Sequence, residues 1–164
     1  MQKYSITDDI LLQYMQAENE AEVFEIFKAC RQDLNWISNF SAGDRETFLW
    51  QQFEIEKKQY ALFYPEAAFY LICYRQKTVG RLYLTSAAKD IRILDIGLLE
   101  DYRSMGIGSQ VIQHLIHQAL QNRQSLSLQV TWFNSSAFNF YQSLGFTVLN
   151  CTGIGYEMKY ISQT

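Results

Sequence analysis

Cysteine and proline are scarce in this chain of 164 residues. Its one proline is Pro65, and its three cysteines, Cys30, Cys73 and Cys151, lie far apart in the sequence. An odd number of cysteines without any Cys-x-x-Cys pair predicts neither a disulfide framework nor a zinc site. We therefore interpret each cysteine as a small core residue of a protein from a reducing compartment.

Positive charge and long apolar runs are also lacking. The 17 acidic residues outnumber the 14 lysines and arginines, which gives a formal net charge of −3 and an isoelectric point near 5.4. This balance argues against a nucleic-acid-binding protein and against a polybasic membrane anchor. No apolar run approaches the roughly 20 residues of a membrane span, and the first residues lack the cationic and apolar regions of a signal peptide. We therefore expect a cytoplasmic protein whose partners include neither nucleic acid nor membrane.

Aromatic side chains, in contrast, are abundant, with 3 Trp, 11 Tyr and 11 Phe. Together with a hydrophobic content of 48%, they exclude a disordered chain and supply enough apolar material for a core. No internal repeat, low-complexity tract or Gly/Ser-rich linker divides the sequence. We therefore expect residues 1–164 to form a single domain.

Apolar periodicity and turn residues predict strands and helices in the order β-α-α-β-β-β-α-β-α-β-β. The predicted strands are Ile10–Gln16, Ala68–Arg75, Thr78–Thr85, Ile91–Leu99, Ser125–Phe133, Phe146–Cys151 and Tyr156–Ile161. The predicted helices begin at Asn19, Asp44, Gly106 and Ser135. A tight hairpin is expected at Gln76-Lys77. Hairpins and crossovers in this order require a mixed α/β sheet with helices on both faces.

A phosphate-binding turn is indicated where the apolar strand Ile91–Leu99 leads into Arg103-x-x-Gly106-x-Gly108 and then into an amphipathic helix. Glycines at this place let the backbone approach a ligand closely, and the amides at the start of the helix attract phosphate. The turn is not a P-loop, because Ser109 and Gln110 follow in place of Lys and Ser or Thr. It also lacks the third glycine of the dinucleotide fingerprint.

A second motif follows about 30 residues later. It reads Asn134-Ser-Ser-Ala-Phe-Asn-Phe-Tyr141-Gln-Ser-Leu-Gly145-Phe146, between two predicted strands. With both motifs in this order, the chain resembles the GNAT (general N-acetyltransferase) superfamily, whose acetyl-CoA turn and following Asn…Tyr…Gly-Phe motif match these positions. The resemblance covers roughly residues 68–160 well, and the earlier part by layout only. It implies an α/β fold of the α+β type: a mixed, mostly antiparallel sheet of about seven strands, splayed in the middle and flanked by about four helices.

The resemblance also implies where acetyl-CoA, the expected cosubstrate, would bind. Its pyrophosphate would rest on the turn, and its pantetheine would pair like an added strand with the edge near Ile96 to Leu98. The Leu98 amide would donate a hydrogen bond to the thioester carbonyl. Asn134 would cap its helix, contact pantetheine, or do both. The expected cofactor-binding residues are Ile96, Gly97, Leu98, Leu99, Arg103, Ser104, Met105, Gly106, Ile107, Gly108, Ser109, Asn134 and Tyr141.

Tyr141 is the residue that the resemblance marks as the general acid. A departing CoA thiolate needs a proton, and a tyrosine hydroxyl can donate one. Tyr141 also belongs to an i, i+3, i+4, i+7 stripe with Ala137, Phe140 and Leu144, so packing alone is an alternative role. Gly97, inside a strand, suits a β-bulge, a close ligand approach or simple packing.

The general base is harder to assign. Some superfamily members use a Glu on the strand before the Asn motif, but the corresponding position here is Gln129, which cannot accept the proton. Asp95 is the best replacement, because it interrupts an apolar strand two residues before Gly97. Alternatives are a structural Asp that holds a neighbouring backbone group or arginine, and deprotonation by water.

The acceptor is expected to be a small-molecule or peptide amine, bound near an aromatic-rich segment, residues 36–70. A subset of these aromatic side chains could line a pocket for an apolar amine. His114 and His117 lack accompanying ligands, so we predict solvated histidines and no metal. The leading hypothesis is an N-acetyltransferase that works in a ternary complex, and a homodimer stays open. The rival, kept open by Gln129, is a non-catalytic acetyl-CoA sensor or interaction module of the same fold.

Overall fold

In the computed structural model, which describes residues 3–162, one eight-stranded sheet has the order β1-β2-β3-β4-β5-β6-β8-β7. Its strands are β1 (Lys3–Ser5), β2 (Ile10–Tyr14), β3 (Ala68–Tyr74), β4 (Lys77–Ser86), β5 (Asp90–Leu98), β6 (Ser125–Thr131), β7 (Thr147–Cys151) and β8 (Gly155–Tyr160). The α-helices are α1 (Glu20–Cys30), α2 (Ala42–Phe63), α3 (Ile107–Gln121) and α4 (Ser135–Ser143). Short 3-10 helices are η1 (Ala17–Asn19), η2 (Gln32–Asn39) and η3 (Glu100–Tyr102).

Neighbouring strands are antiparallel except for β5 and β6, which run parallel. The predicted mixed, mostly antiparallel sheet is therefore confirmed, and so are the four α-helices in the described part of the chain. The strand count exceeds the expected seven by one, because the three-residue strand β1 lacks enough residues to show a period-2 pattern.

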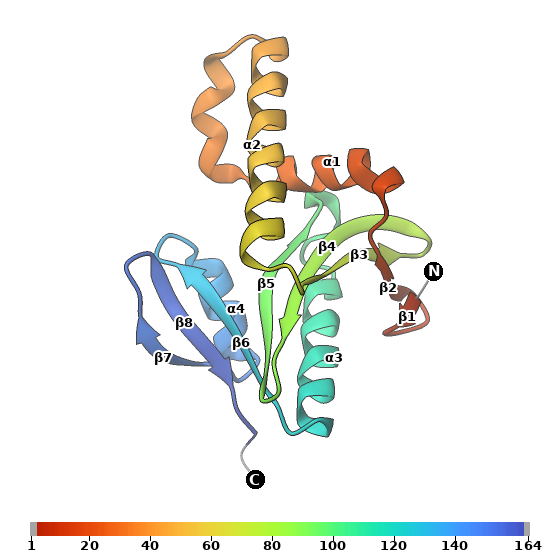
Figure 1. Ribbon diagram of the computed structural model, residues 1–164, viewed down its shortest axis with the longest axis vertical. Coiled ribbons are helices and arrows are strands. Elements are labelled where there is room, and N and C mark those ends of the chain that lie inside the picture. The colour runs from red at the N-terminus through yellow and green to blue at the C-terminus, as the bar shows by residue number, and fades with distance from the viewer. Residues whose placement is uncertain (1–2, 163–164) are drawn as a thin grey trace.

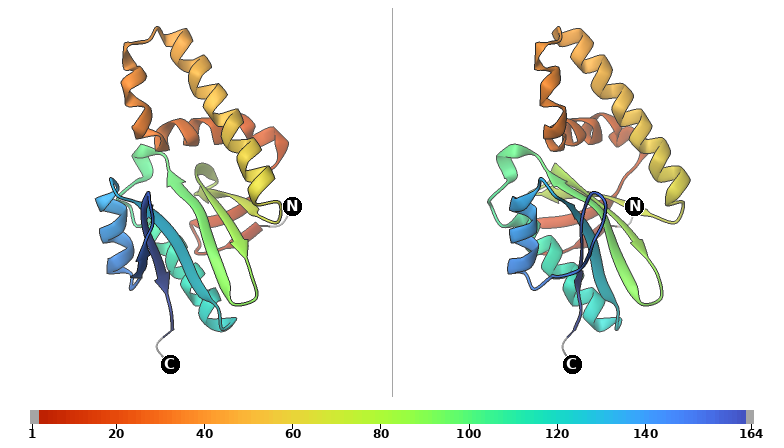
Figure 2. Two further views of the ribbon diagram at one scale, coloured as in Figure 1. Left: turned by 60° about the vertical axis from the view of Figure 1, so that its left-hand side comes forward. Right: turned by 90° about the vertical axis from the view of Figure 1, so that its left-hand side faces the viewer.

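The helices cover both faces of the sheet, as predicted (Figures 1 and 2). α3 packs on one face together with α4, and its buried stripe recurs at helical spacing. That stripe consists of Ile107, Val111, Ile112 and Leu115. α1 packs on the opposite face, where Val23, Phe24 and Phe27 meet β2 and β3. The two helical layers enclose two separate cores, one on each face of the sheet.

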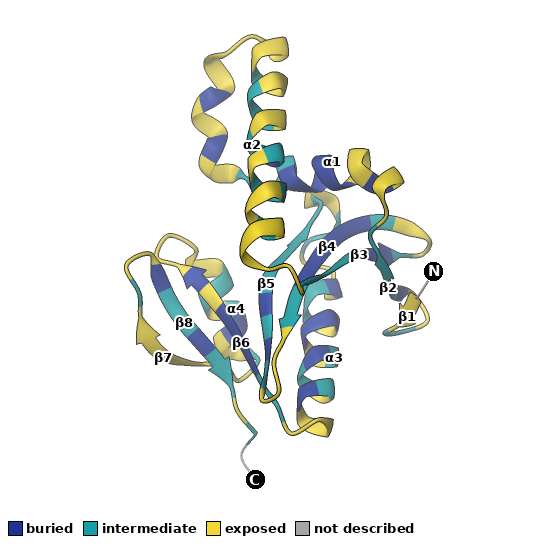
Figure 3. Ribbon diagram, in the orientation of Figure 1, coloured by how far each residue is buried: buried dark blue, intermediate teal, exposed yellow. Residues whose placement is uncertain are grey.

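α2 is anchored to the body by few side chains. Its 22 residues include only one buried residue, Phe53. The first turns of α2 and the neighbouring η2 project beyond the sheet (Figure 1), and Figure 3 shows that most of this arm is exposed. Ser41 caps the helix by accepting a hydrogen bond from the Asp44 amide at 3.2 Å. The C-terminal half of α2 therefore lies over the sheet while the N-terminal half extends away from it.

The hairpin between β3 and β4 turns one residue earlier than predicted. Its turn residues are Arg75 and Gln76, with φ of 47° and 69°, and Lys77 already belongs to β4. Two consecutive residues with positive φ are the signature of the two-residue turns that match the twist of a hairpin. Neither residue is the glycine or asparagine usual at such positions, which is why the sequence misplaced the turn.

Candidate active site

A gap between β5 and β6 opens in the middle of the sheet. The two strands pair only over Asp90–Arg92 and Ser125–Ser127. β5 nevertheless continues to pair with β4 as far as Leu98. One edge of β5 beyond Arg92 therefore has no strand partner among the described residues, and Figures 1 and 2 show β5 and β6 diverging there. The splay expected from the resemblance is present.

The backbone of this β5 edge points into the gap. The Leu99 amide donates to the Val79 carbonyl on β4 at 2.8 Å, and antiparallel strands alternate bonded and non-bonded pairs. Leu98, opposite Gly80, is therefore in a non-bonded pair, and its amide points away from β4. Ile96, two residues earlier, has the same orientation. The amides of Ile96 and Leu98 are thus available to a ligand in the gap, whereas that of Leu99 is already bonded.

The predicted phosphate-binding turn follows the exposed edge. Gly106 has a φ of +82° and immediately precedes α3, without a side-chain cap on the helix. A residue with a Cβ is strained in this left-handed region. Ser104 also has a positive φ, 61°. The turn therefore leaves the amides of the first helical turn of α3 without a side-chain acceptor, and the helix dipole adds partial positive charge there.

Arg103 stabilises this turn from within the protein. Its Nε donates to the Leu98 carbonyl at 3.1 Å, and its other guanidinium nitrogen donates to the Ala29 carbonyl at 2.7 Å. Ala29 lies in the last turn of α1, where a cation is favourable. The two hydrogen bonds indicate that Arg103 holds the loop in place.

α4 carries Asn134 and Tyr141. Asn134 caps the helix, because its side-chain oxygen accepts a hydrogen bond from the Ala137 amide at 3.1 Å. Tyr141 is only 7% exposed, and its ring contacts Phe140 and Phe146 at 5.2 and 5.5 Å between centroids. The packing role of Tyr141 is therefore real, and any catalytic role would come in addition to it.

The Tyr141 hydroxyl is different from the buried ring. It makes no hydrogen bond within residues 3–162, yet no fully buried side-chain oxygen or nitrogen in that range lacks a partner. The hydroxyl must therefore reach an accessible surface. Burial raises the pKa of Tyr141 well above its ordinary value, and the charge of Asp95 raises it further. Tyr141 is therefore a neutral hydrogen-bond donor at physiological pH, and the negative charge of Asp95 further disfavours its ionisation.

Asp95 does not stand alone, since it belongs to an ionic cluster that sequence reasoning missed. Arg81 Nε on β4 donates to Asp95 at 2.6 Å, and the other two guanidinium nitrogens donate to the two carboxylate oxygens of Glu56, both at 2.8 Å. Arg81 also contacts the Tyr83 hydroxyl at 3.4 Å. The structural alternative for Asp95, an aspartate that holds an arginine, is therefore present. A charged residue inside the apolar strand around Leu82 was the signal that could have found Arg81.

Gly97 lies under helix α1 and not in a bulge. The register irregularity of β5 falls between Ile93 and Asp95, so the bulge expected at Gly97 is wrong. A Cβ built on Gly97 would lie only 2.4 Å from Cys30 Sγ. A side chain at position 97 would therefore clash with the Cys30 sulfur unless Cys30 or α1 moved. Burial and Asp95 both raise the pKa of the Cys30 thiol. This disfavours the thiolate that acetyl transfer through an acetyl-cysteine intermediate would need.

Gln129 is engaged in a hydrogen bond on β6. Its side-chain nitrogen donates to Thr152 Oγ1 at 2.8 Å. Glu157 lies opposite Gln129 on β8, but both of its carboxylate oxygens accept from Arg92 on β5. The neighbourhood of Gln129 thus contains a carboxylate, and that carboxylate is held in an ion pair.

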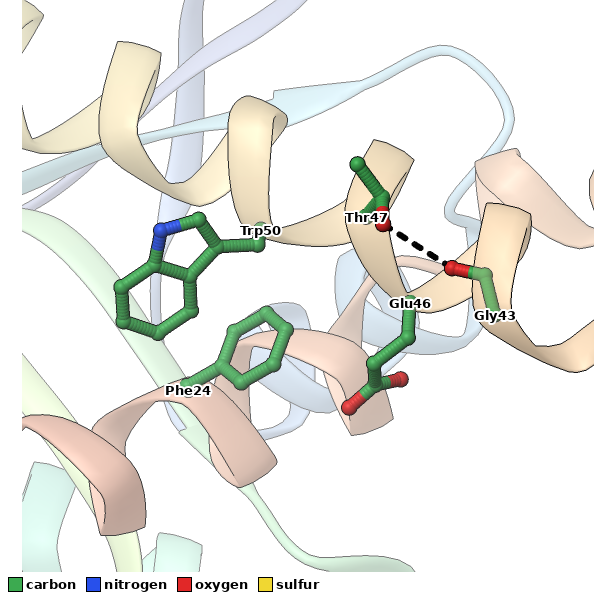
Figure 4. Close-up of a pocket in the computed structure, with 5 residues that line it drawn as sticks. All are labelled: Phe24, Gly43, Glu46, Thr47 and Trp50. Carbon is green, nitrogen blue, oxygen red and sulfur yellow. Dashed lines mark hydrogen bonds between the residues drawn. The ribbon is translucent and has the colours of Figure 1, made fainter.

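Two hollows lie along α2, outside the β5–β6 gap. The first, of about 460 Å³, lies between α1 and α2 and is lined by Phe24, Gly43, Glu46, Thr47 and Trp50. Figure 4 shows the Phe24 and Trp50 rings together on one side and Glu46 on the other, with a hydrogen bond from Thr47 Oγ1 to the Gly43 carbonyl at 3.0 Å. The second, of about 270 Å³, includes Phe53, Lys57 and Tyr83 in its lining. Both adjoin α2, which belongs to the aromatic-rich segment expected near the acceptor.

Residues 3–162 contain neither a group of potential metal ligands nor a helix that could span a membrane. No group of three or more His, Cys, Asp or Glu side chains is arranged to hold a metal ion there. No helix in that range is both long and apolar enough to cross a membrane.

Known proteins share both the sequence pattern and the fold. The profile of the acetyltransferase (GNAT) family matches residues 14–146. N-alpha-acetyltransferase 50 of Danio rerio is 32% identical over 63 residues, which are 37% of this chain and 38% of that protein. The aligned part thus spans less than half of this curated relative.

Two solved structures resemble the whole chain. One is an N-acetyltransferase (PaiA) from Thermoplasma acidophilum in complex with coenzyme A, with a TM-score of 0.70, 18% identity, and coverage of 93% of this chain and 99% of that one. The other is an acetyltransferase from Salmonella typhimurium, described as modifying the N-terminal serine of a ribosomal protein. Its TM-score is 0.67 at 14% identity, with coverage of 99% and 100%. At these identities the likeness shows a shared fold.

Proposed function

The chain belongs to the acetyltransferase (GNAT) family, and on this premise we propose that it transfers an acetyl group from acetyl-CoA to a primary amine. The observation that carries the proposal is the coincidence of two features at one gap in the sheet, the outward-pointing amides of β5 and the uncapped start of α3. The proposal adds a third feature, the Tyr141 hydroxyl on α4, which makes no hydrogen bond within residues 3–162. Pantetheine needs the first, pyrophosphate the second and a departing thiolate the third.

Acetyl-CoA would bind along the gap. Its pyrophosphate accepts hydrogen bonds from amides between Arg103 and Ser109, the stretch that ends in the first turn of α3. A Cβ on Gly108 would meet only Leu98 Cδ1, at 3.9 Å, so packing does not require glycine here and close approach of a ligand supplies a reason. Pantetheine pairs with the β5 edge. The thioester oxygen accepts from the Leu98 amide, which stabilises negative charge as it develops on that oxygen.

The amine attacks the thioester carbon directly. A C–N bond forms and the C–S bond breaks, the amine proton leaves to Asp95 or to water, and the thiolate receives a proton from Tyr141. Because burial keeps Tyr141 neutral, its hydroxyl still carries its proton when the C–S bond breaks, and solvent returns that proton after the transfer. The same desolvation also makes a CoA thiolate beside Tyr141 a stronger base. Asp95 is held by Arg81 through one carboxylate oxygen, and its other oxygen makes no hydrogen bond within residues 3–162.

The acceptor belongs to the class of primary amines, and a peptide or protein N-terminus is one candidate, since the similar Salmonella protein is described as modifying an N-terminal serine. A panel of tryptamine, spermidine and short peptides with free N-termini separates the alternatives. We expect thiol release from acetyl-CoA with at least one of them. A preference for spermidine over tryptamine would contradict the apolar pocket suggested by the aromatic segment.

Tyr141→Phe tests the mechanism. We expect kcat to fall by about 10²- to 10⁴-fold, the usual contribution of a general acid, with acetyl-CoA affinity almost unchanged because the ring is retained. Full activity in Tyr141→Phe would refute the assigned role. Binding of CoA in native mass spectrometry without thiol release for any amine would instead favour the rival function, a non-catalytic acetyl-CoA sensor.

A further inference from the structure

Arg81 is the only buried charged residue in the part of the chain that the structure describes, with 3% of its side chain exposed. Its guanidinium lies between two elements that belong to different parts of the fold. Glu56 comes from α2, and Asp95 comes from β5 beside the gap. We call Glu56, Arg81 and Asp95 the carboxylate clamp.

The clamp is geometrically specific. Arg81 meets Glu56 with two parallel hydrogen bonds at 2.8 Å, the fork arrangement in which both the distance and the plane of a carboxylate are set. Its Nε is used for Asp95 at 2.6 Å. The ring of Tyr83 lies 4.7 Å from the guanidinium carbon and adds a cation–π contact. Few orientations of Arg81 satisfy all these contacts at once.

α2 has little else to hold its C-terminal half on the sheet. Phe53 is its one buried residue, and Glu56 and Tyr60 follow at i+3 and i+7 on the same helix face. The Tyr60 ring meets Tyr83 edge-on, at 5.1 Å between centroids. Glu56 thus lies on α2 between its one buried residue, Phe53, and the Tyr60–Tyr83 contact.

Stability alone is a weak reason for such a cluster. Desolvating charged groups costs free energy, and apolar residues of similar size often replace a buried ion pair without loss. What the pairing supplies is a single relative placement of the two elements it joins. Two carboxylates share one guanidinium here, so the cluster keeps one surplus negative charge, which favours an ammonium group approaching from the gap.

We propose that Arg81 is a positioning residue for the acceptor side of the reaction, because the carboxylate clamp fixes α2 against β5 and holds the Asp95 carboxylate in one place. This inference rests on the proposed function. It assigns Arg81 and Glu56 no contact with acetyl-CoA. Loosening the clamp should therefore affect the acceptor amine and leave cosubstrate binding unaltered.

Glu56→Gln is the test variant, since glutamine keeps the shape of the side chain and one acceptor for Arg81 while removing the charge. Glu54→Gln is the matched control: Glu54 lies two residues away on α2 and pairs with Lys57 at the surface, at 2.6 Å. We expect Glu56→Gln to raise KM for the best amine of the panel about tenfold or more. The Kd of acetyl-CoA, measured by calorimetry, should stay within about twofold, and Glu54→Gln should leave both unaltered.

Hydrogen exchange supplies a readout that does not depend on turnover. Amides of residues 56–63 should exchange faster in Glu56→Gln than in Glu54→Gln, because the helix is released from the sheet. Arg81→Lys, which retains one charge but not the fork, should shift KM in the same direction.

Three results would overturn the positioning role. One is an unaltered KM for the amine in Glu56→Gln. Another is an apparent kcat that falls only as far as the fraction of folded protein falls, while KM stays the same. The third is equal exchange in the two variants. Absence of thiol release by the wild-type protein with every amine is a different result, because it refutes the proposed function itself. The exchange comparison then still decides whether the clamp holds α2.

Discussion

Gly97→Ala tests whether the contact between α1 and β5 is as tight as the structure shows. A Cβ at position 97 would lie 2.4 Å from Cys30 Sγ and 3.6 Å from Cys30 Cβ. The first distance is far inside van der Waals contact, and the second is ordinary. The conflict is therefore with the sulfur alone, and α1 or the side chain must move to relieve it.

The expected cost follows from overpacking a core, about 1–3 kcal/mol. For a chain of this size, each kcal/mol lowers the melting temperature by about 2–4 °C, so Gly97→Ala should lower it by about 2–12 °C. Cys30→Ala removes the sulfur and leaves the Cβ. In the Cys30→Ala background, Gly97→Ala should leave the free energy of unfolding almost unchanged. It should even raise it by up to about 1 kcal/mol, because alanine lowers the conformational entropy of the unfolded chain.

Thermal unfolding of the wild type, of the two single variants and of the Cys30→Ala/Gly97→Ala double variant forms a double-mutant cycle, which measures the coupling between the two positions. We expect a coupling free energy of about 1–2 kcal/mol, with the double variant more stable than the sum of the single effects. An equal loss from Gly97→Ala in both backgrounds would refute the steric argument. The double variant also tests whether Gly97 is needed for ligand binding. A tenfold loss of acetyl-CoA affinity in this variant, despite its restored stability, would show that acetyl-CoA also requires glycine at position 97.

Three further predictions concern the turn, the thiols and the tyrosines. Arg103→Ala removes two charge-assisted hydrogen bonds that hold the turn and should weaken acetyl-CoA binding by about tenfold or more in calorimetry; unchanged affinity would show that the turn holds its shape without it. Iodoacetamide should modify exposed Cys151 first, half-buried Cys30 more slowly and buried Cys73 last. Because the pKa of Cys30 is raised, its alkylation should remain slow at pH 8.5 in peptide mapping, and rapid alkylation there would contradict this. Burial raises the pKa of Tyr83 to about 12 and also raises that of Tyr141. The unfolded chain therefore loses these protons first, so the contribution of the two tyrosines to the free energy of unfolding should be constant up to about pH 10 and fall above it. Above that pH the wild type should lose stability more steeply than the double Phe variant.

Local features of the site could be predicted from the sequence. The turn before α3 needs a residue that tolerates positive φ, and Gly106 occurs there at φ +82°. Asn134 precedes a short helix and caps it, as its residue type indicates. Both features depend on neighbours within a few residues, so a single sequence contains the information. The splay between β5 and β6 came only through resemblance to a family.

Contacts between distant segments could not be predicted in the same way. Arg81 bonds Glu56 and Asp95 across 25 and 14 residues of sequence, and Cys30 meets the β5 edge across 68 residues. Strand and helix periodicity fixes which face of an element a residue occupies and says nothing about which residue opposes it. Asp95 was identified as unusual because a carboxylate interrupts an apolar strand, and its partner was found only in the fold.

The aromatic segment 36–70 is a second case in which the sequence did not show which residues contact one another, and this case concerns the expected acceptor pocket. Helix geometry divides these rings into separate groups with different surroundings. Trp36, Phe40 and Phe48 contact one another on the projecting arm, and Trp50 and Phe53 pack with α1. Near the carboxylate clamp the segment contributes Tyr60 and Phe69, both in edge contact with Tyr83. Most of the aromatic excess therefore supports α2 and the arm. Under the proposed function, we expect Tyr60, Tyr83 and the charge that Arg81 holds in place to select the amine.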